Sequence, residues 1–491
     1  MSGSSCVLKI EVNGQRRIGE AGRQRCQLPG SHHGPERADV QRGVEAPVPG
    51  NNYTTTIVSD TSIDFLEDAM KDKSKPFFLM AATVACHASS DNADFEEGDD
   101  GETMPHGGKN AEGPVPIPED EYKNDFMDLK VPDRGSYGKH GGVSWVSMLK
   151  PFTADEENFN QLWFRRRLQA LQSVDKMVKR IVDKLDAEGV LDNTYIIYTT
   201  DNGFHIGQHR LRPGKTCPFE EDINIPLIIR GPKVPKGATT DVVSSHTDIV
   251  PTILKWAGQE NNAAKNLDGK ALVTTKEMQD DAEEQNYEHT NVEYWGTPYF
   301  QGKKKNEDWG IPMHPTNTYK ATRVIGKGYN LMYSVYCSGE HELYDMTADP
   351  AQTNNLVTNN NSPQASRTPS ADEPAQSPSK NGKRQVSGAT KIKIGDIEAS
   401  FESIRDRLDA LTAVLMKCKG DTCTKPWKVL HPSGDVHTFK DAMLAKFDSF
   451  YHQQEKVKFD SCTDGYFAES ESPEEVKPFG GGAGTQRMGK M

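Results

Sequence analysis

The sequence lacks long apolar runs and an excess of positive charge. No stretch approaches the roughly 20 apolar residues of a membrane-spanning helix, so no membrane span is predicted. Its 58 Lys and Arg residues are outnumbered by 71 Asp and Glu residues, and the net charge of −13 argues against a general nucleic-acid binder. The first residues contain no apolar segment of the kind that a signal peptide needs, and eight cysteines do not decide the compartment, so the localisation stays open.

Apolar residues are also scarce in three segments. Residues 1–50, 358–392 and 478–491 are rich in Gly, Pro, Ser and polar residues, without helical or alternating periodicity. Such composition cannot bury enough apolar surface to offset the entropy of ordering, so we expect a disordered lead, a linker and a flexible tail. The remaining chain is long enough for a large core and two domains.

One stretch combines a strand with oxygen and nitrogen ligands. Residues 195–200 form a short β-branched and aromatic run that predicts a buried strand, and Asp201, Asn202 and Gly203 end it as a turn. Asp and Asn oxygens suit Ca²⁺ or Mg²⁺. Cationic residues that could hold an anion follow within fourteen positions: His205, His209, Arg210, Arg212 and Lys215. Taken singly, the turn and the lysine are more often a plain turn and a solvated charge.

The surrounding periodicity predicts an α/β arrangement. Residues 152–189 carry apolar side chains at three- and four-residue steps, which indicates a long helix, and residues 227–229 give a second strand after the motif. Residues 77–85 form an apolar run that predicts a buried strand ending beside His87. Residues 54–59 are a further possible strand, followed by a helix to residue 70. We expect helix, loop and strand to form units with right-handed crossovers.

The C-terminal half shows strand and helix patterns of a smaller unit. Residues 318–336 alternate as a strand pair, and residues 394–416 are amphipathic at helical spacing. A helix is predicted near Thr247 and Asp248, with Pro251 in its first turn. Cys418 and Cys423 are close enough in sequence for a small disulfide loop in an oxidising compartment.

The order of these features resembles the sulfatase family of the alkaline-phosphatase superfamily, most closely the fungal-type arylsulfatases. The resemblance is carried by the Asp201-Asn202-Gly203 turn with its later Lys215, by the strand ending at His87, and by the closing segment 342–356. It implies a mostly parallel sheet flanked by helices, with incomplete N-terminal strands and a smaller C-terminal α+β subdomain. It also implies a catalytic domain over 51–357, interrupted by an acidic loop insert over 88–125, and a C-terminal subdomain over 393–477.

The same resemblance implies a site. Asp201 and Asn202 take metal-ligand positions, with calcium as the expected cation, while Lys215 and His87 take catalytic and sulfate-binding positions. The family's nucleophile is a formylglycine made from a Cys/Ser-x-Pro-x-Arg motif, and no cysteine or serine in these 491 residues heads that motif. No nucleophile is therefore predicted.

The implied function is hydrolysis of a sulfate ester, whose alcohol is a small molecule or a carbohydrate, and the family suggests an extracellular or secretory route. Two alternatives remain open. The chain could be a catalytically inactive remnant that binds anions, because it lacks the nucleophile motif. It could also be a phosphoesterase of the same superfamily, although Asn202 weighs against that alternative, since those relatives prefer His at this position.

Overall fold

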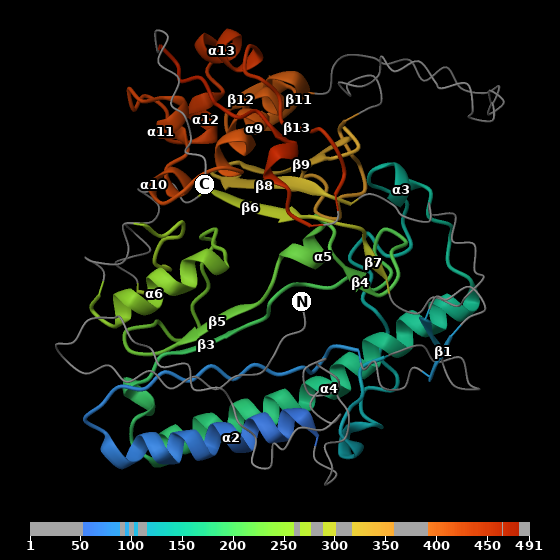
Figure 1. Cartoon of the computed structure of the whole chain (residues 1–491), viewed down its shortest axis with the longest axis vertical. Coiled ribbons are helices and arrows are strands. Elements are labelled where there is room, and N and C mark those ends of the chain that lie inside the picture. The colour runs from blue at the N-terminus through green and yellow to red at the C-terminus, as the bar shows by residue number, and fades with distance from the viewer. Residues whose placement is uncertain are drawn as a thin grey trace.

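A computed structural model of the chain describes residues 53–88, 94–97, 103–106, 115–259, 266–275, 288–300, 317–357, 391–463 and 465–480. The predicted lead over 1–50, nearly all of the predicted linker and the end of the tail lie outside these residues. Figure 1 shows the longest helices at one end of the molecule, the largest sheet near the other end, and a smaller sheet between them.

The long predicted helix is confirmed. Helix α4 (Ala154–Ala187) begins at Thr153, whose hydroxyl accepts the N–H of Glu156 while the Glu156 carboxylate accepts the N–H of Thr153. Helix α2 (Thr54–Ala69) packs along α4 (Figure 1). The predicted strand over 54–59 is wrong, because these residues form the first turns of α2. The spacing of its buried residues explains this, since they lie on one helical face: Thr55, Ser59, Ser62 and Leu66.

The two strands of the motif are confirmed, but their direction differs from the expectation. Strand β3 (Ile196–Thr199) pairs with β5 (Leu227–Arg230) in an antiparallel, two-stranded sheet. Every strand pair in the described residues is antiparallel, so the predicted parallel sheet is not found there, although the mixed α/β character is. The 77–85 segment is extended and half-buried, but it forms no ladder and is not a strand. Ile228 of β5 is 62% exposed.

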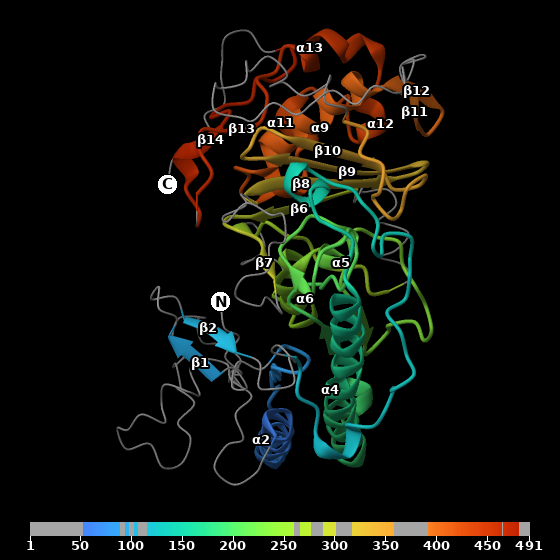
Figure 2. The ribbon, with the colours of Figure 1, turned by 90° about the vertical axis from the view of Figure 1, so that its right-hand side faces the viewer.

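The predicted strand pair over 318–336 is confirmed within a four-stranded antiparallel sheet. Its order is β10-β9-β8-β6, and the strands are β6 (His289–Tyr294), β8 (Tyr319–Gly326), β9 (Tyr329–Tyr336) and β10 (His341–Asp345). Figure 2 shows this sheet edge-on, with α9, α11, α12 and α13 on one side and α5 and α6 on the other. Both faces of the sheet are therefore covered.

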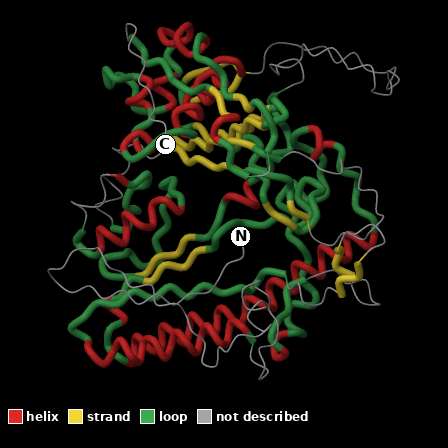
Figure 3. Tube along the Cα trace, in the orientation of Figure 1, coloured by secondary structure: helices red, strands yellow, loops and turns green. Residues whose placement is uncertain are grey.

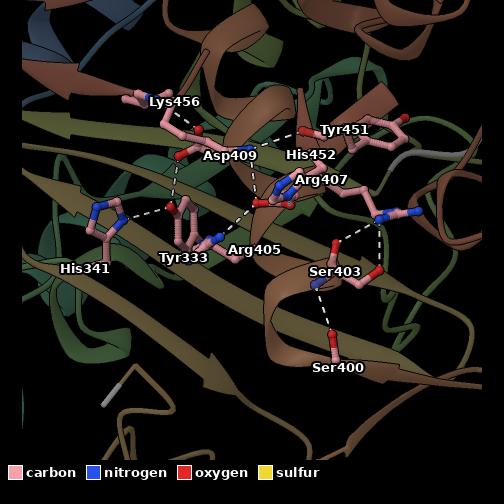
Figure 4. A network of polar contacts seen from close by, with 12 residues as sticks. Tyr333, His341, Ser400, Ser403, Arg405, Arg407, Asp409, Tyr451, His452 and Lys456 are labelled. Carbon is pink, nitrogen blue, oxygen red and sulfur yellow. Dashed lines mark hydrogen bonds and ion pairs between the residues drawn. The ribbon is translucent and has the colours of Figure 1, made fainter. Parts of the chain in front are cut away.

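Each face of this sheet packs into its own core. On the α9 (Phe401–Leu415) side, residues of β8, β9 and β10 share one apolar cluster with α9, α11, α12 and α13. Asp409 of α9 lies inside it, where its carboxylate accepts the Tyr333 hydroxyl at 2.9 Å and the N–H of Val457 at 2.9 Å (Figure 4). On the opposite face, Tyr319, Met332 and Tyr344 pack against the loops that follow β3.

Shorter elements connect these layers (Figure 3). The acidic insert contains a hairpin of β1 (Asp94–Glu97) and β2 (Thr103–His106). The expected helix near Asp248 is α6 (Ile249–Trp256). The predicted 394–416 helix is shorter than expected, because a hairpin precedes α9. The remaining elements are η1 (Met70–Asp72), η2 (Asp120–Tyr122), α3 (Ser144–Ser147), η3 (Leu191–Asn193), β4 (Gly214–Lys215), α5 (Glu220–Ile223), η4 (His246–Asp248), β7 (Tyr299–Phe300), β11 (Lys391–Ile394), β12 (Ile397–Ser400), α10 (Asp421–Thr424), α11 (Trp427–Leu430), α12 (Phe439–Ala442), η6 (Ala445–Phe447), α13 (Asp448–His452), β13 (Lys458–Phe459), η7 (Ala468–Ser470) and β14 (Glu471–Ser472).

Two disulfides cross-link the C-terminal half. Cys418 and Cys423 are bonded, as predicted from their spacing, and Cys337 is bonded to Cys462 across 125 positions. Among the helices that the structure describes, none combines the length and apolar character needed to cross a membrane.

Candidate sulfate-binding site

Lys215 and Asn202 meet in the loop after β3. The Lys215 Nζ donates a hydrogen bond to the Asn202 Oδ1 at 3.2 Å. Lys215 is held there because β4 pairs with β7, with Lys215 opposite Tyr299. Gly203 allows the loop to close against α5, since a Cβ at this position would lie 2.0 Å from the Glu221 carbonyl oxygen. An ammonium and an amide oxygen thus converge from positions thirteen residues apart.

Asp201 and Asn202 supply too few oxygens for a calcium shell. The Asp201 side chain is exposed, and its Oδ1 accepts the N–H of Asn202 at 2.9 Å. The Asn202 Oδ1 accepts a hydrogen bond from the Lys215 ammonium. Calcium takes about six to eight oxygen ligands, so these two residues do not fit a complete site by themselves. No described group of three or more metal-type ligands includes Asp201.

His205 and His209, from the predicted cationic set, lie in the interior and not at an anion site. His205 is fully buried, and its Nδ1 lies 2.8 Å from Asp222 Oδ1. His209 is buried and stacks on Phe219, with ring centroids 3.9 Å apart. Burial lowers the pKa of His209 to about 3, so its imidazole is neutral at pH 7.

Arg210 and Arg212 are also engaged elsewhere. Arg210 donates to the carbonyl oxygens of Gly138 and Leu149, at 3.2 and 3.1 Å. Arg212 forms an ion pair with Glu156 at the start of α4. The expectation that these cations face an anion is therefore wrong for both arginines and for His205 and His209. Lys215 is the member of the set that reaches Asn202.

A buried cluster behind β4 was missed from the sequence. Ligand atoms of His205, Cys217 and Asp222 all lie within 4.8 Å of one another. The backbone N–H of Cys217 donates to Asp222 Oδ2 at 2.7 Å, and burial raises the pKa of the Cys217 thiol well above its usual range. The carboxylate therefore fixes the imidazole and the start of α5. No spacing rule links residues 205, 217 and 222, so only the fold brings them together.

His87 lies at the end of the extended 77–84 segment. Its side chain is exposed, and its Nδ1 lies 3.0 Å from the Ala88 carbonyl oxygen. Among the described residues it is not hydrogen-bonded to Asn202 or Lys215. The neighbouring Cys86 lies close enough to Tyr198 of β3 to add to the rise in the Tyr198 pKa, which burial mainly causes. His87 therefore follows a segment that passes β3, and its role stays a prediction.

Comparison with known proteins identifies the family. The sulfatase family model matches residues 22–259, and a second model, described as N-sulphoglucosamine sulphohydrolase, C-terminal, matches residues 207–368. A sulfatase, ppz1, from Metarhizium majus is 35% identical over 438 residues, covering 88% of this chain and 82% of the relative. An arylsulfatase from Volvox carteri is 28% identical, covering 84% of this chain and 58% of the relative.

The name of a third relative includes a carbohydrate. The N-acetylglucosamine-6-sulfatase from Bos taurus is 29% identical, covering 62% of this chain and 52% of the relative. The chain thus spans little more than half the length of the algal and bovine relatives. The identification as a sulfatase, a family of sulfuric ester hydrolases, is confirmed at the level of the family. On the strength of its fungal relative, this chain belongs to the sulfatase family.

Proposed function

We propose that the loop after β3 binds the sulfate group of a sulfate ester, and that the chain acts as an arylsulfatase-type hydrolase. The observation that carries the proposal is the contact between the Lys215 ammonium and the Asn202 amide oxygen, beside the exposed Asp201 carboxylate. An ammonium provides three donors and a compact positive charge, which suits a sulfate oxygen.

The roles follow from the groups present. Lys215 would exchange its bond to Asn202 for a sulfate oxygen and stabilise the charge that develops there. His87, exposed at the end of its segment, would donate a proton to the departing alcohol. A divalent cation, when bound, would polarise the sulfate, and Asp201 and Asn202 would supply part of its oxygen ligands.

A second candidate is an anion-binding protein without turnover. It is favoured by the absence of any Cys/Ser-x-Pro-x-Arg motif from the 491 residues, because a covalent mechanism without its nucleophile loses several orders of magnitude in rate. The phosphoesterase alternative rests on no contact in the described residues.

The test replaces Lys215 with methionine and measures binding of inorganic sulfate by calorimetry. A charge-assisted hydrogen bond contributes about 1.5–3 kcal/mol, so binding should weaken roughly 10- to 150-fold. The matched control is Lys236→Met, which removes an exposed lysine elsewhere. Equal sulfate affinity in wild type and Lys215→Met would contradict the proposal.

Turnover assays separate the candidates. Hydrolysis of nitrocatechol sulfate that Lys215→Met abolishes would support the hydrolase. Sulfate binding without turnover would favour the anion-binding protein, and faster hydrolysis of an aryl phosphate than of an aryl sulfate would favour a phosphoesterase.

We further infer that the protein passes through an oxidising compartment. The structure contains two disulfides, one of which links residues 125 positions apart. Disulfides persist in secreted proteins and are rare in cytosolic ones. A secretory or extracellular setting would also expose the site to sulfated carbohydrates. Free-thiol titration of the purified protein under denaturing conditions checks this, since reduced Cys337 and Cys462 would contradict it.

A further inference from the structure

Three side chains of metal-ligand type lie together in the interior behind β4. We propose that the imidazole of His205, the thiolate of Cys217 and the carboxylate of Asp222 bind a zinc ion. Their ligand atoms all lie within 4.8 Å of one another, and each residue is at most 5% exposed. The inference goes beyond the proposed function, because none of the three residues is assigned to the sulfate or to its expected calcium ion.

The three types of ligand suit zinc. Zn²⁺ binds thiolate, imidazole and carboxylate in tetrahedral geometry, at about 2.3 Å for sulfur and about 2.0 Å for nitrogen and oxygen. Ligand atoms around such an ion are roughly 3.3–3.8 Å apart, so a group already within 4.8 Å needs only small side-chain shifts. The 2.8 Å contact between His205 Nδ1 and Asp222 Oδ1 would lengthen slightly. Calcium and magnesium are disfavoured here, because they prefer oxygen ligands.

Charge balance also favours a divalent ion. A thiolate and a carboxylate carry two negative charges, which Zn²⁺ neutralises, and a neutral imidazole adds none. The metal and its ligands would therefore form a neutral unit, which avoids the cost of an uncompensated buried charge. Without a metal, burial raises the pKa of the Cys217 thiol well above its usual range. Zinc binding would release the thiol proton to solvent, since a coordinating thiol is deprotonated by the ion.

Two buried imidazoles have nitrogens that the fold does not use. The Nε2 of His205 and both ring nitrogens of His209 have no hydrogen-bond partner among the described residues, although both residues are almost fully buried. Such groups are rare in folded proteins, because a buried polar atom without a partner is destabilising. Burial and, after it, the charge of His205 lower the pKa of His209, so the two rings are close enough to interact. A tetrahedral ion takes four ligands, and His209 is the candidate for the fourth.

The zinc ion would join both ends of the loop after β3. His205 follows the turn that ends β3, and Cys217 lies two positions after Lys215. The N–H of His205 donates to the Gly214 carbonyl oxygen at 3.0 Å, and that of Gly214 donates to the His205 carbonyl oxygen at 3.1 Å. An ion shared by these segments and by α5 would hold the loop that presents Lys215. Its role is structural, because the ligands are buried away from solvent.

The experiment measures bound metal in the full chain, produced in medium that contains zinc or, in parallel, cobalt. Elemental mass spectrometry should find about one zinc ion per wild-type chain, and the cobalt form should show thiolate-to-cobalt charge-transfer absorption. Cys217→Ser should remove this absorption and weaken zinc binding at least about 100-fold, because losing a group that only orients a ligand already costs about 10- to 100-fold. Cys86→Ser is the matched control, since Cys86 is the other described cysteine without a disulfide, and it should keep both signals.

A second variant tests the charge balance and covers the case in which Cys217→Ser folds poorly. Asp222→Asn keeps an oxygen for the Cys217 N–H but leaves one positive charge uncompensated, so it should also lose zinc while circular dichroism shows an intact fold. A wild type with no more zinc than Cys217→Ser or Asp222→Asn would overturn the proposal and leave a hydrogen-bonded cluster. A cobalt form without thiolate absorption, or one whose absorption disappears in Cys86→Ser, would overturn it as well.

Discussion

Glu288 is predicted to make the protein less stable as the pH rises. It precedes β6 and is only 4% exposed. Its carboxylate accepts the Trp427 Nε1–H at 2.6 Å, the Phe439 N–H at 2.7 Å and the Tyr329 hydroxyl. None of these donors carries a charge, and burial raises the pKa of Glu288 from 4.5 to about 7.

The sign and size follow from proton linkage. Between pH 4.5 and 7 the folded protein holds a proton on Glu288 that the unfolded chain has released. The folded state therefore binds more protons, and its stability falls as the pH rises through this window. This rise in the Glu288 pKa corresponds to a change of about 3 kcal/mol in the unfolding free energy, at roughly 1.4 kcal/mol for each pKa unit. The full stabilising effect is present below pH 4.5 and is lost above pH 7.

The test is Glu288→Gln, which removes the titration but keeps an oxygen acceptor. We expect the unfolding free energy of the wild type to fall between pH 5 and 8 by about 3 kcal/mol more than that of the variant. Urea unfolding followed by tryptophan fluorescence measures both, and Glu474→Gln, an exposed carboxylate, is the control. Burial also raises the pKa of Glu342 to about 7 and that of Asp409 to about 6, so the variant keeps part of the slope. Identical pH dependence in wild type and Glu288→Gln would refute the reasoning.

Three further changes probe the fold. Lys320→Met leaves the almost fully buried Glu471 carboxylate without its ammonium partner, and should lower the unfolding free energy measured by chemical denaturation by about 3–5 kcal/mol. A decrease below about 1 kcal/mol would show that the carboxylate finds other partners. Cys337→Ser with Cys462→Ser opens a loop of 125 positions and should cost about 2–5 kcal/mol, and an unchanged melting temperature would contradict this. Thr153→Ala removes the cap of α4 and should cost about 1 kcal/mol, with Thr153→Ser as the variant that keeps the cap.

Local periodicity correctly predicted the elements that are stabilised by contacts close in sequence, or whose two faces are both covered. Helix α4 has a capping residue and a sustained helical repeat, and strands β8 and β9 alternate across a two-residue connection. The strand predicted over 77–85 is wrong, because an apolar run becomes a strand only when a neighbouring strand supplies hydrogen-bond partners. The same apolar run remains extended here, but without a ladder.

The site was predictable only where its residues are close in sequence. Asn202 and Lys215 belong to one motif, and the structure brings them into contact. Asn317 donates from its Nδ2 to the Thr216 carbonyl oxygen, but it could not be connected to that motif, because it lies 101 positions further along the chain and no spacing encodes its approach. The Cys337–Cys462 disulfide was missed for the same reason, since sequence does not determine connectivity.

The apolar cluster on the α9 side of the sheet draws members from both sides of residues 358–390. Leu331 and Leu343 belong to the earlier stretch, and Leu408 and Leu411 to the later one, and all four are fully buried. In a chain that stopped at residue 357, one whole apolar face of the sheet would be exposed to water, and the truncated protein would be prone to self-association. The C-terminal region is therefore not a detachable appendage, and truncations that remove it should yield insoluble protein rather than a smaller active unit.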